Sequence, residues 1–245
     1  MVSNQIGNIL LIIDPFLREP ANDGINVISE LLAEIQKEKY FAVYTEVFFP
    51  SHSSETLRQY LESVTKRNKR VIGVISLGSY ANVTDKLEWV NVFGNDLKEC
   101  IIKKGIPFLG ICFSHQLFGW LYGAKVDYVV DRENLPEKKY NEFRKVTLWN
   151  ERLKSILGEA SSFISHAKHE QEVKNIPEDL ELTCTSEHCE IEGLAHKVYP
   201  AFSFQTHPED FHESREGWNL ISRFIGFFIM VSVSPPKSSV GGLKK

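Results

Sequence analysis

Cys112 is the residue best placed in the sequence to act as a nucleophile, because it stands where an apolar run meets a helix-forming segment. Residues 107–111 predict a buried strand and residues 114–122 predict a helix. A cysteine on such a sharp strand-to-helix turn, or elbow, lies at the carboxyl edge of the sheet. The start of the helix favours the thiolate, and the backbone N–H of Phe113 would point to where an oxyanion forms.

A base and an orienting carboxylate follow a second apolar run. His207 and Glu209 are two positions apart, so on an extended segment both side chains would project to the same side. Glu209 would then hold the imidazole ring while its other nitrogen faces the thiol. Taken singly, these residues would be a buried structural cysteine, a surface histidine and a solvated charge. Together and in chain order, they favour a cysteine hydrolase.

The elements that must position these residues alternate along the chain. Predicted strands are residues 8–13, 40–49, 71–76, 107–111, 180–185, 190–196 and 201–205, and predicted helices are residues 24–38, 55–65, 89–103, 114–122 and 217–230. This alternation predicts an α/β fold, with a mainly parallel twisted sheet covered by helices on both faces.

The region after the elbow helix is less regular. Residues 126–130 and 145–148 predict antiparallel strands or an excursion at the sheet edge, with a charged stretch at 131–145 between them. We expect one domain over residues 1–233 and a loose tail over residues 234–245.

Composition excludes several classes of function. Charged residues make up 24% and hydrophobic residues 42% of the chain, and the net charge of -4 offers no basic field for nucleic acid or an anionic membrane. The apolar runs at 9–13 and 224–233 are too short for a bilayer span or a signal-peptide core, which predicts a cytoplasmic protein. The four cysteines show no paired framework, and Cys184 and Cys189 fit no common zinc spacing, so we expect neither metal nor cofactor.

Two motifs resemble those of the class I glutamine amidotransferases. The family's elbow is Gly-x-Cys-x-Gly-His-Gln, and residues 110–116 read Gly-Ile-Cys-Phe-Ser-His-Gln. The family's second motif is Gln-x-His-Pro-Glu, which residues 205–209 match as Gln-Thr-His-Pro-Glu. The resemblance implies a flavodoxin-like fold over roughly residues 8–230 and a triad of Cys112, His207 and Glu209.

Weaker matches extend the resemblance to the binding site. Gly78 follows the strand at 71–76 and would supply the second oxyanion donor, although Tyr80 stands where the family has proline. His169 begins a segment similar to His-x-Asp-x-Val of GMP synthetase amidotransferase domains and free-standing γ-glutamyl peptidase-like members, with Gln171 in place of the aspartate. Gln116 and His169 are therefore candidate substrate-binding residues.

The resemblance implies hydrolysis of the glutamine γ-amide through a γ-glutamyl thioester. The chain has no room for a synthetase module, so the ammonia acceptor would lie on a separate synthetase chain. Alternatives are a free-standing hydrolase of γ-glutamyl peptides or conjugates, and a scaffold or regulatory protein. The last follows from Ser114, because a hydroxymethyl group where the family has glycine is expected to displace Cys112 or narrow the pocket.

Overall fold

The computed structural model describes the chain except residues 1–5, 18–20, 39–41, 130–140, 211–214 and 234–245. The predicted tail at 234–245 and most of the charged stretch at 131–145 lie outside the described residues. Within them, no helix has the length and apolar character that a bilayer span requires.

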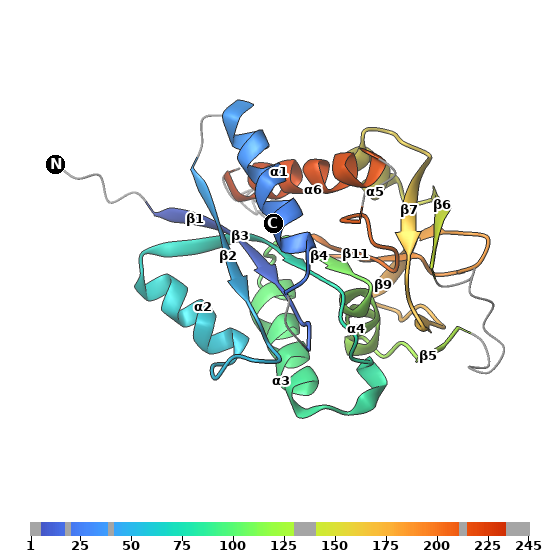
Figure 1. Ribbon diagram of the computed structural model, residues 1–245, viewed down its shortest axis with the longest axis horizontal. Coiled ribbons are helices and arrows are strands. Elements are labelled where there is room, and N and C mark those ends of the chain that lie inside the picture. The colour runs from blue at the N-terminus through green and yellow to red at the C-terminus, as the bar shows by residue number, and fades with distance from the viewer. Residues whose placement is uncertain (1–5, 18–20, 39–41, 130–140, 211–214, 234–245) are drawn as a thin grey trace, which may run out of the picture.

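A nine-stranded mixed sheet forms the centre of the molecule, in the order β2-β1-β3-β4-β11-β10-β9-β6-β7. The first five strands in this order pair in parallel and are called the parallel half (Figure 1). They are β2 (Val43–Phe48), β1 (Gly7–Ile13), β3 (Lys69–Ser76), β4 (Phe108–Ile111) and β11 (Ala201–Phe204). Gly110 of β4 is paired with Ser76 on one side and Ser203 on the other, so three strands end together at one edge.

The remaining strands run antiparallel to their neighbours and are called the antiparallel half. They are β10 (Gly193–His196), β9 (Leu180–Thr185), β6 (Glu142–Leu148) and β7 (Ser162–Ala167). A separate two-stranded sheet joins β5 (Val126–Tyr128) to β8 (Gln171–Val173).

Helices cover both faces of the sheet. In Figure 1, α1 (Gly24–Glu38) and α6 (Arg215–Val233) lie above it, and α2 (Leu57–Lys66), α3 (Glu88–Asp96) and α4 (Phe113–Leu121) lie below. The short α5 (Glu151–Leu157) packs against α6, a 3₁₀ turn η1 covers Val83–Asp85, and η2 (Leu97–Ile102) is a π-helix.

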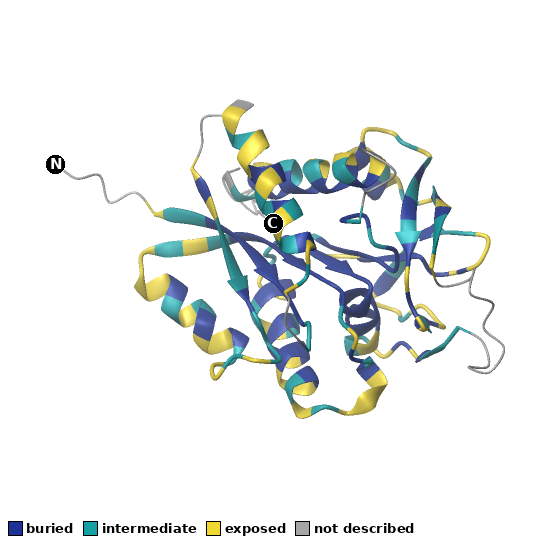
Figure 2. Cartoon of the chain, viewed as in Figure 1, coloured by how far each residue is buried: buried dark blue, intermediate teal, exposed yellow. Residues whose placement is uncertain are grey.

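Two hydrophobic cores separate by strand alternation. Leu10 and Ile12 of β1 lie in the core between the sheet and the helices α1 and α6. Ile9, Leu11 and Ile13 point to the opposite face and lie in the core between the sheet and the helices α2, α3 and α4. Figure 2 shows the central strands almost entirely buried. This burial on both faces explains the continuous apolar runs in the sequence.

The expected α/β fold is confirmed, and the helix predicted at 24–38 has those bounds. The helical segment predicted at 89–103 is present but changes from α to π geometry at Leu97. Four elements were not predicted: the 3₁₀ turn η1, the helix α5, and the strands β7 and β8. Local signals for α5 exist, since the Asn150 side chain caps the Leu153 N–H and Gly158 ends the helix at φ 73°.

Candidate active site

Cys112 forms a strained elbow between β4 and α4. Its φ of 52° and ψ of -103° are outside the regions that residues with a side chain normally occupy. Its N–H donates to the Phe204 carbonyl at 2.8 Å, and its own carbonyl accepts from the N–H groups of His115 and Gln116, both at 3.0 Å. These bonds to β11 and α4 hold the cysteine at the sheet edge, where it is 6% exposed.

Gly78 lies against both Cys112 and His207. A Cβ atom added at Gly78 would be 2.9 Å from His207 Cε1 and 3.5 Å from Cys112 Cβ, so only glycine fits without movement. Phe113 is the first residue of α4, where a helical N–H has no intrahelical acceptor. The structure therefore places the two predicted oxyanion donors next to the thiol.

His207 and Glu209 form the predicted pair, although not through the predicted geometry. His207 Nδ1 is 2.8 Å from Glu209 Oε1. The segment is a turn, closed by the Asp210 N–H to the His207 carbonyl at 3.1 Å, rather than extended. The expectation of an extended segment was wrong because the chain must turn after His207, whose own N–H donates to the His166 carbonyl at 2.7 Å.

The surroundings of His207 favour its charged form. Burial by itself would lower the pKa of His207, but Coulombic attraction and hydrogen bonds from Cys112 and Glu209 raise the pKa well above its usual value. The imidazolium therefore persists to higher pH than in a free histidine. A charged imidazole beside a thiol is the arrangement that stabilises a thiolate.

Two further groups approach the thiol, and neither was singled out from the sequence. Cys112 Sγ is 3.7 Å from the Lys168 carbonyl oxygen and 3.8 Å from Gln205 Nε2. Gln205 stands in the second motif, which was the available signal for it. No local signal indicated Lys168, because it comes from the antiparallel half, after β7.

Ser114 is accommodated without an unsatisfied hydroxyl. Ser114 and Ser76 are completely buried, and their Oγ atoms are 2.7 Å apart. Ser114 Oγ also lies 2.8 Å from the Leu77 carbonyl oxygen, to which it donates. The hydroxymethyl group thus connects α4 to the end of β3, one residue before Gly78.

Two cavities meet at Cys112. The larger, about 610 Å³, is called the α1-side cavity, and its lining includes Asn22, Asp23, Glu30, Gly78, His207 and Glu209. The smaller, about 310 Å³, is called the β8-side cavity, and its lining includes Asn82, Phe113, Gln116, His169, Glu170 and Gln171. Ser79, Tyr80, Cys112 and Lys168 line both.

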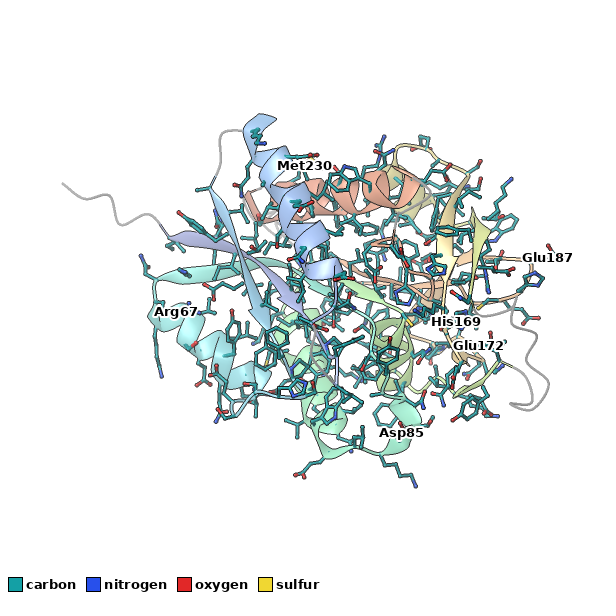
Figure 3. The ribbon with its side chains drawn as sticks, in the orientation of Figure 1. Arg67, Asp85, His169, Glu172, Glu187 and Met230 are labelled. Carbon is teal, nitrogen blue, oxygen red and sulfur yellow. The ribbon has the colours of Figure 1, made fainter. Side chains whose placement is uncertain are left out.

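The predicted binding residues Gln116 and His169 both line the β8-side cavity. Gln116 Nε2 donates to the Gln171 carbonyl at 2.7 Å, which fixes β8 against α4. His169, labelled in Figure 3, has Nδ1 3.0 Å from the same carbonyl. Because a carbonyl oxygen can only accept a hydrogen bond, His169 Nδ1 must carry the ring proton, which leaves Nε2 as an acceptor.

His169 is neutral at physiological pH. Burial, together with the positive charge of Arg144, lowers its pKa to about 3. His169 Nε2 and Gln171 Oε1 are both buried without a hydrogen-bond partner among the described residues. Both residues line the β8-side cavity, but these two atoms have almost no accessible surface, so a ligand would reach them only after a small movement of the surrounding groups.

Among the described residues, no three His, Cys, Asp or Glu side chains are grouped as metal ligands. Burial raises the pKa values of Cys184 and Cys189 well above their usual range. His166 Nδ1 is 2.6 Å from an Asp210 carboxylate oxygen, and the His166 ring stacks on Phe143.

The fold and site define a class of protein: an α/β domain whose buried cysteine stands on a strand-to-helix elbow beside a histidine–glutamate pair. The glutamine amidotransferase class-I family matches residues 46–226. The chain belongs to this family, whose members are enzymes that hydrolyse glutamine.

Several relatives carry the name of the same subunit of glutamine-hydrolyzing GMP synthase. Those of Methanopyrus kandleri and Methanocaldococcus jannaschii are 34% and 35% identical to the chain over 42% and 47% of its length. The matched segment spans only 52% and 58% of these two relatives. The relative from Methanococcus vannielii is 28% identical over 71% of the chain and 79% of its own length.

Solved structures share the fold at low sequence identity. A protein from Thermoplasma acidophilum, described as one of the GMP synthase subunits, has a TM-score of 0.66 at 21% identity, covering 93% of this chain and 96% of its own. A glutamine amidotransferase from Thermotoga maritima has a TM-score of 0.57 at 19% identity, covering 94% and 87%. The flavodoxin-like fold expected from the motifs is confirmed.

Proposed function

We propose that the protein hydrolyses the γ-amide of glutamine through a γ-glutamyl thioester on Cys112. The observation that carries this proposal is the contact between a strained cysteine and a histidine whose Nδ1 is held 2.8 Å from Glu209. The raised pKa of His207 supports it, because the imidazolium both stabilises the thiolate and supplies a proton.

In the first step, the Cys112 thiolate attacks the amide carbon and a C–S bond forms. The N–H groups of Gly78 and Phe113 stabilise the negative charge on oxygen. His207 then protonates the amide nitrogen, the C–N bond breaks, and ammonia leaves. Glu209 keeps the ring oriented and stabilises its positive charge.

In the second step, neutral His207 removes a proton from water, which attacks the thioester. Collapse of the tetrahedral intermediate breaks the C–S bond and releases glutamate, and the thiolate–imidazolium pair is restored. Both steps use only the three side chains, the two N–H groups and water, and water is the one molecule consumed besides the substrate.

The β8-side cavity binds the amino-acid end of the substrate. His169 Nε2 and Gln171 Oε1 are buried acceptors without a partner among the described residues, and a small movement on binding would let them accept from an ammonium group, which has three donors. Lys168 lines the same cavity and supplies a positive charge for the α-carboxylate. Gln116 acts indirectly, by holding β8 in place.

Ammonia would pass to an acceptor on a separate synthetase chain, since the relatives are named as subunits of a synthase. The scaffold alternative is based on Ser114, whose hydroxyl is hydrogen-bonded at the end of β3. Activity of a Ser114→Gly variant tests whether this side chain impairs Cys112.

The test is the intact mass after incubation with a glutamine-like chloroketone. We expect one adduct on the wild type and on Cys100→Ala, a variant lacking a half-buried thiol remote from the site, and none on Cys112→Ala. Wild-type protein that stays unlabelled, while a control amidotransferase reacts, would contradict the proposal. Glutaminase activity should fall at least roughly 10⁴-fold in Cys112→Ala.

A further inference from the structure

The two cavities at Cys112 cannot serve the same part of a substrate. An amide held at the thiol has an acyl part on one side of the scissile bond and an amine part on the other. His207 lines the α1-side cavity, and it is not among the residues that line the β8-side cavity. Because His207 must deliver its proton to the departing nitrogen, the amine part lies in the α1-side cavity.

We propose that the α1-side cavity is a leaving-group site for an organic amine that carries a second positive charge. The chain would then hydrolyse γ-glutamyl amides of diamines. This inference rests on the proposed function, since it uses the same thiol and the same thioester. The amine leaves with the proton from His207 instead of ammonia, and water completes the hydrolysis to glutamate, so the atoms balance without a further reactant.

The size of the α1-side cavity supports an organic amine. The cavity holds about 610 Å³, twice the 310 Å³ of the β8-side cavity that receives the glutamyl part. Ammonia needs about the volume of one water molecule, roughly 30 Å³. The cavity therefore has space for an aliphatic chain of several carbons beyond the departing nitrogen.

The charge of the α1-side cavity selects the type of amine. Its lining contains the exposed carboxylates of Asp23 and Glu30, whereas the carboxylate of Asp210 already interacts with His166. Apart from His207, Lys168 is the one cationic side chain among the described lining residues. An anionic leaving group would meet this negative field unfavourably, whereas a second ammonium would be attracted.

Glu209 adds an independent observation. It lines the same cavity and is 5% exposed, and its Oε2 has no hydrogen-bond partner among the described residues, while Oε1 holds His207. A buried carboxylate oxygen without a donor is unfavourable. Oε2 has almost no accessible surface in the free protein, so a departing amine, which carries N–H groups close to His207, supplies that donor once the carboxylate shifts slightly toward the cavity.

An aromatic pair borders the site. The rings of Phe16 and Tyr80 are 4.7 Å apart, and both line the α1-side cavity. Tyr80, which replaces the proline of the family, is 68% exposed and also lines the β8-side cavity. Its ring gives the methylene stem of a diamine an apolar surface at the junction of the two cavities.

The experiment compares four substrates: glutamine and the γ-glutamyl amides of diaminobutane, pentylamine and aminobutyrate. The three amides have similar lengths and end in a positive, a neutral and a negative group. We expect kcat/KM for the diaminobutane amide to be about tenfold higher than kcat/KM for either of the other two amides. A few partly exposed ion pairs are sufficient for a difference of this size. The advantage should shrink as salt concentration rises.

Variants assign the preference to the cavity. The double variant Asp23→Asn with Glu30→Gln should reduce the ratio of kcat/KM for the diaminobutane amide to that for the pentylamine amide to near one, because each new side chain keeps the size of the carboxylate that it replaces and removes its charge. Glu62→Gln, an exposed residue of α2, removes a like charge away from the cavity and should leave the ratio unchanged.

The outcomes separate the two proposals. Hydrolysis of glutamine without hydrolysis of the three amides would overturn the leaving-group site and leave the glutaminase intact, as expected if the cavity receives a partner protein. Equal rates for the three amides, or a ratio insensitive to the double variant, would overturn the charge selection. No turnover of any substrate, with no chloroketone adduct, would overturn both.

Discussion

The parallel and antiparallel halves of the sheet contribute different parts of the site. The parallel half supplies Cys112 after β4, Gly78 after β3, and His207 with Glu209 after β11. The antiparallel half and β8 supply Lys168, His169 and Gln171. Three adjacent parallel strands end at one edge, which fixes the positions of the proposed reacting groups there. The proposed binding groups come from β8 and from the short connection that precedes it.

In the proposed function, the parallel half therefore carries the reacting groups, and the antiparallel half with β8 carries the groups that recognise the substrate. Changes in the parallel half should act mainly on kcat. Changes around β8 should act mainly on KM, because the proposed function assigns those residues to the unreactive end of the substrate. Variants in each half test this distinction.

Glu209→Gln should have the largest effect. It removes the charge that orients His207 and helps raise its pKa, so kcat should fall by up to about 10⁴-fold. Because the reaction needs the imidazolium, activity is lost as pH rises through the His207 pKa. The alkaline limb of the kcat/KM profile should move to lower pH in the variant, and an unmoved limb would contradict the role of Glu209.

Gly78→Ala should come next, with a loss of about a hundredfold in kcat. The new Cβ would stand 2.9 Å from His207 Cε1 and must displace the ring. Gly226→Ala on α6 is the matched control, since its Cβ meets no atom within 4 Å. Steady-state kinetics of both variants, with thermal unfolding to verify folding, test whether the effect is local to the site.

His169→Phe should raise KM about tenfold and leave kcat within about threefold, because it removes one acceptor for the α-ammonium group. The neutral state of His169, with its pKa lowered to about 3, means that this effect should be constant between pH 6 and 9. His188→Phe, in the same half but on an exposed turn, is the control. A fall in kcat alone would place His169 in the reaction instead.

Ser114→Gly should have the smallest effect on activity, less than about threefold. It removes the hydrogen bond that Ser114 Oγ donates to the Leu77 carbonyl and the one that it accepts from Ser76, and leaves the buried Ser76 hydroxyl without that partner. The free energy of unfolding should fall by about 1–2 kcal/mol, measured by denaturant titration. A large gain in activity would instead support the expectation that the hydroxymethyl group distorts the elbow.

Much of the parallel half was predictable because its information is local. Buried parallel strands are continuous apolar runs, the elbow is a strand followed at once by a helix, and the motif at 205–209 places His207 and Glu209 together. The amino-acid sequence alone therefore indicated the fold class, and it singled out the residues that are proposed here as the nucleophile and its base.

The antiparallel half was harder to predict, since its strands are short and their pairing is set by distant partners. β7 alternates buried and partly buried residues, but polar Ser165 and His166 weaken the apolar pattern. β8 has three residues and is held by Val126–Tyr128 and by Gln116, which are far away in the chain.

The way these parts meet depends on tertiary contacts. They turn the segment after His207, hydrogen-bond Ser114 to β3, and bring the Lys168 carbonyl to 3.7 Å from the thiol. They also leave a cavity on each side of Cys112. Residue types and spacing determine which chemistry is available, but the space around a nucleophile depends on contacts between distant segments, which no local pattern encodes.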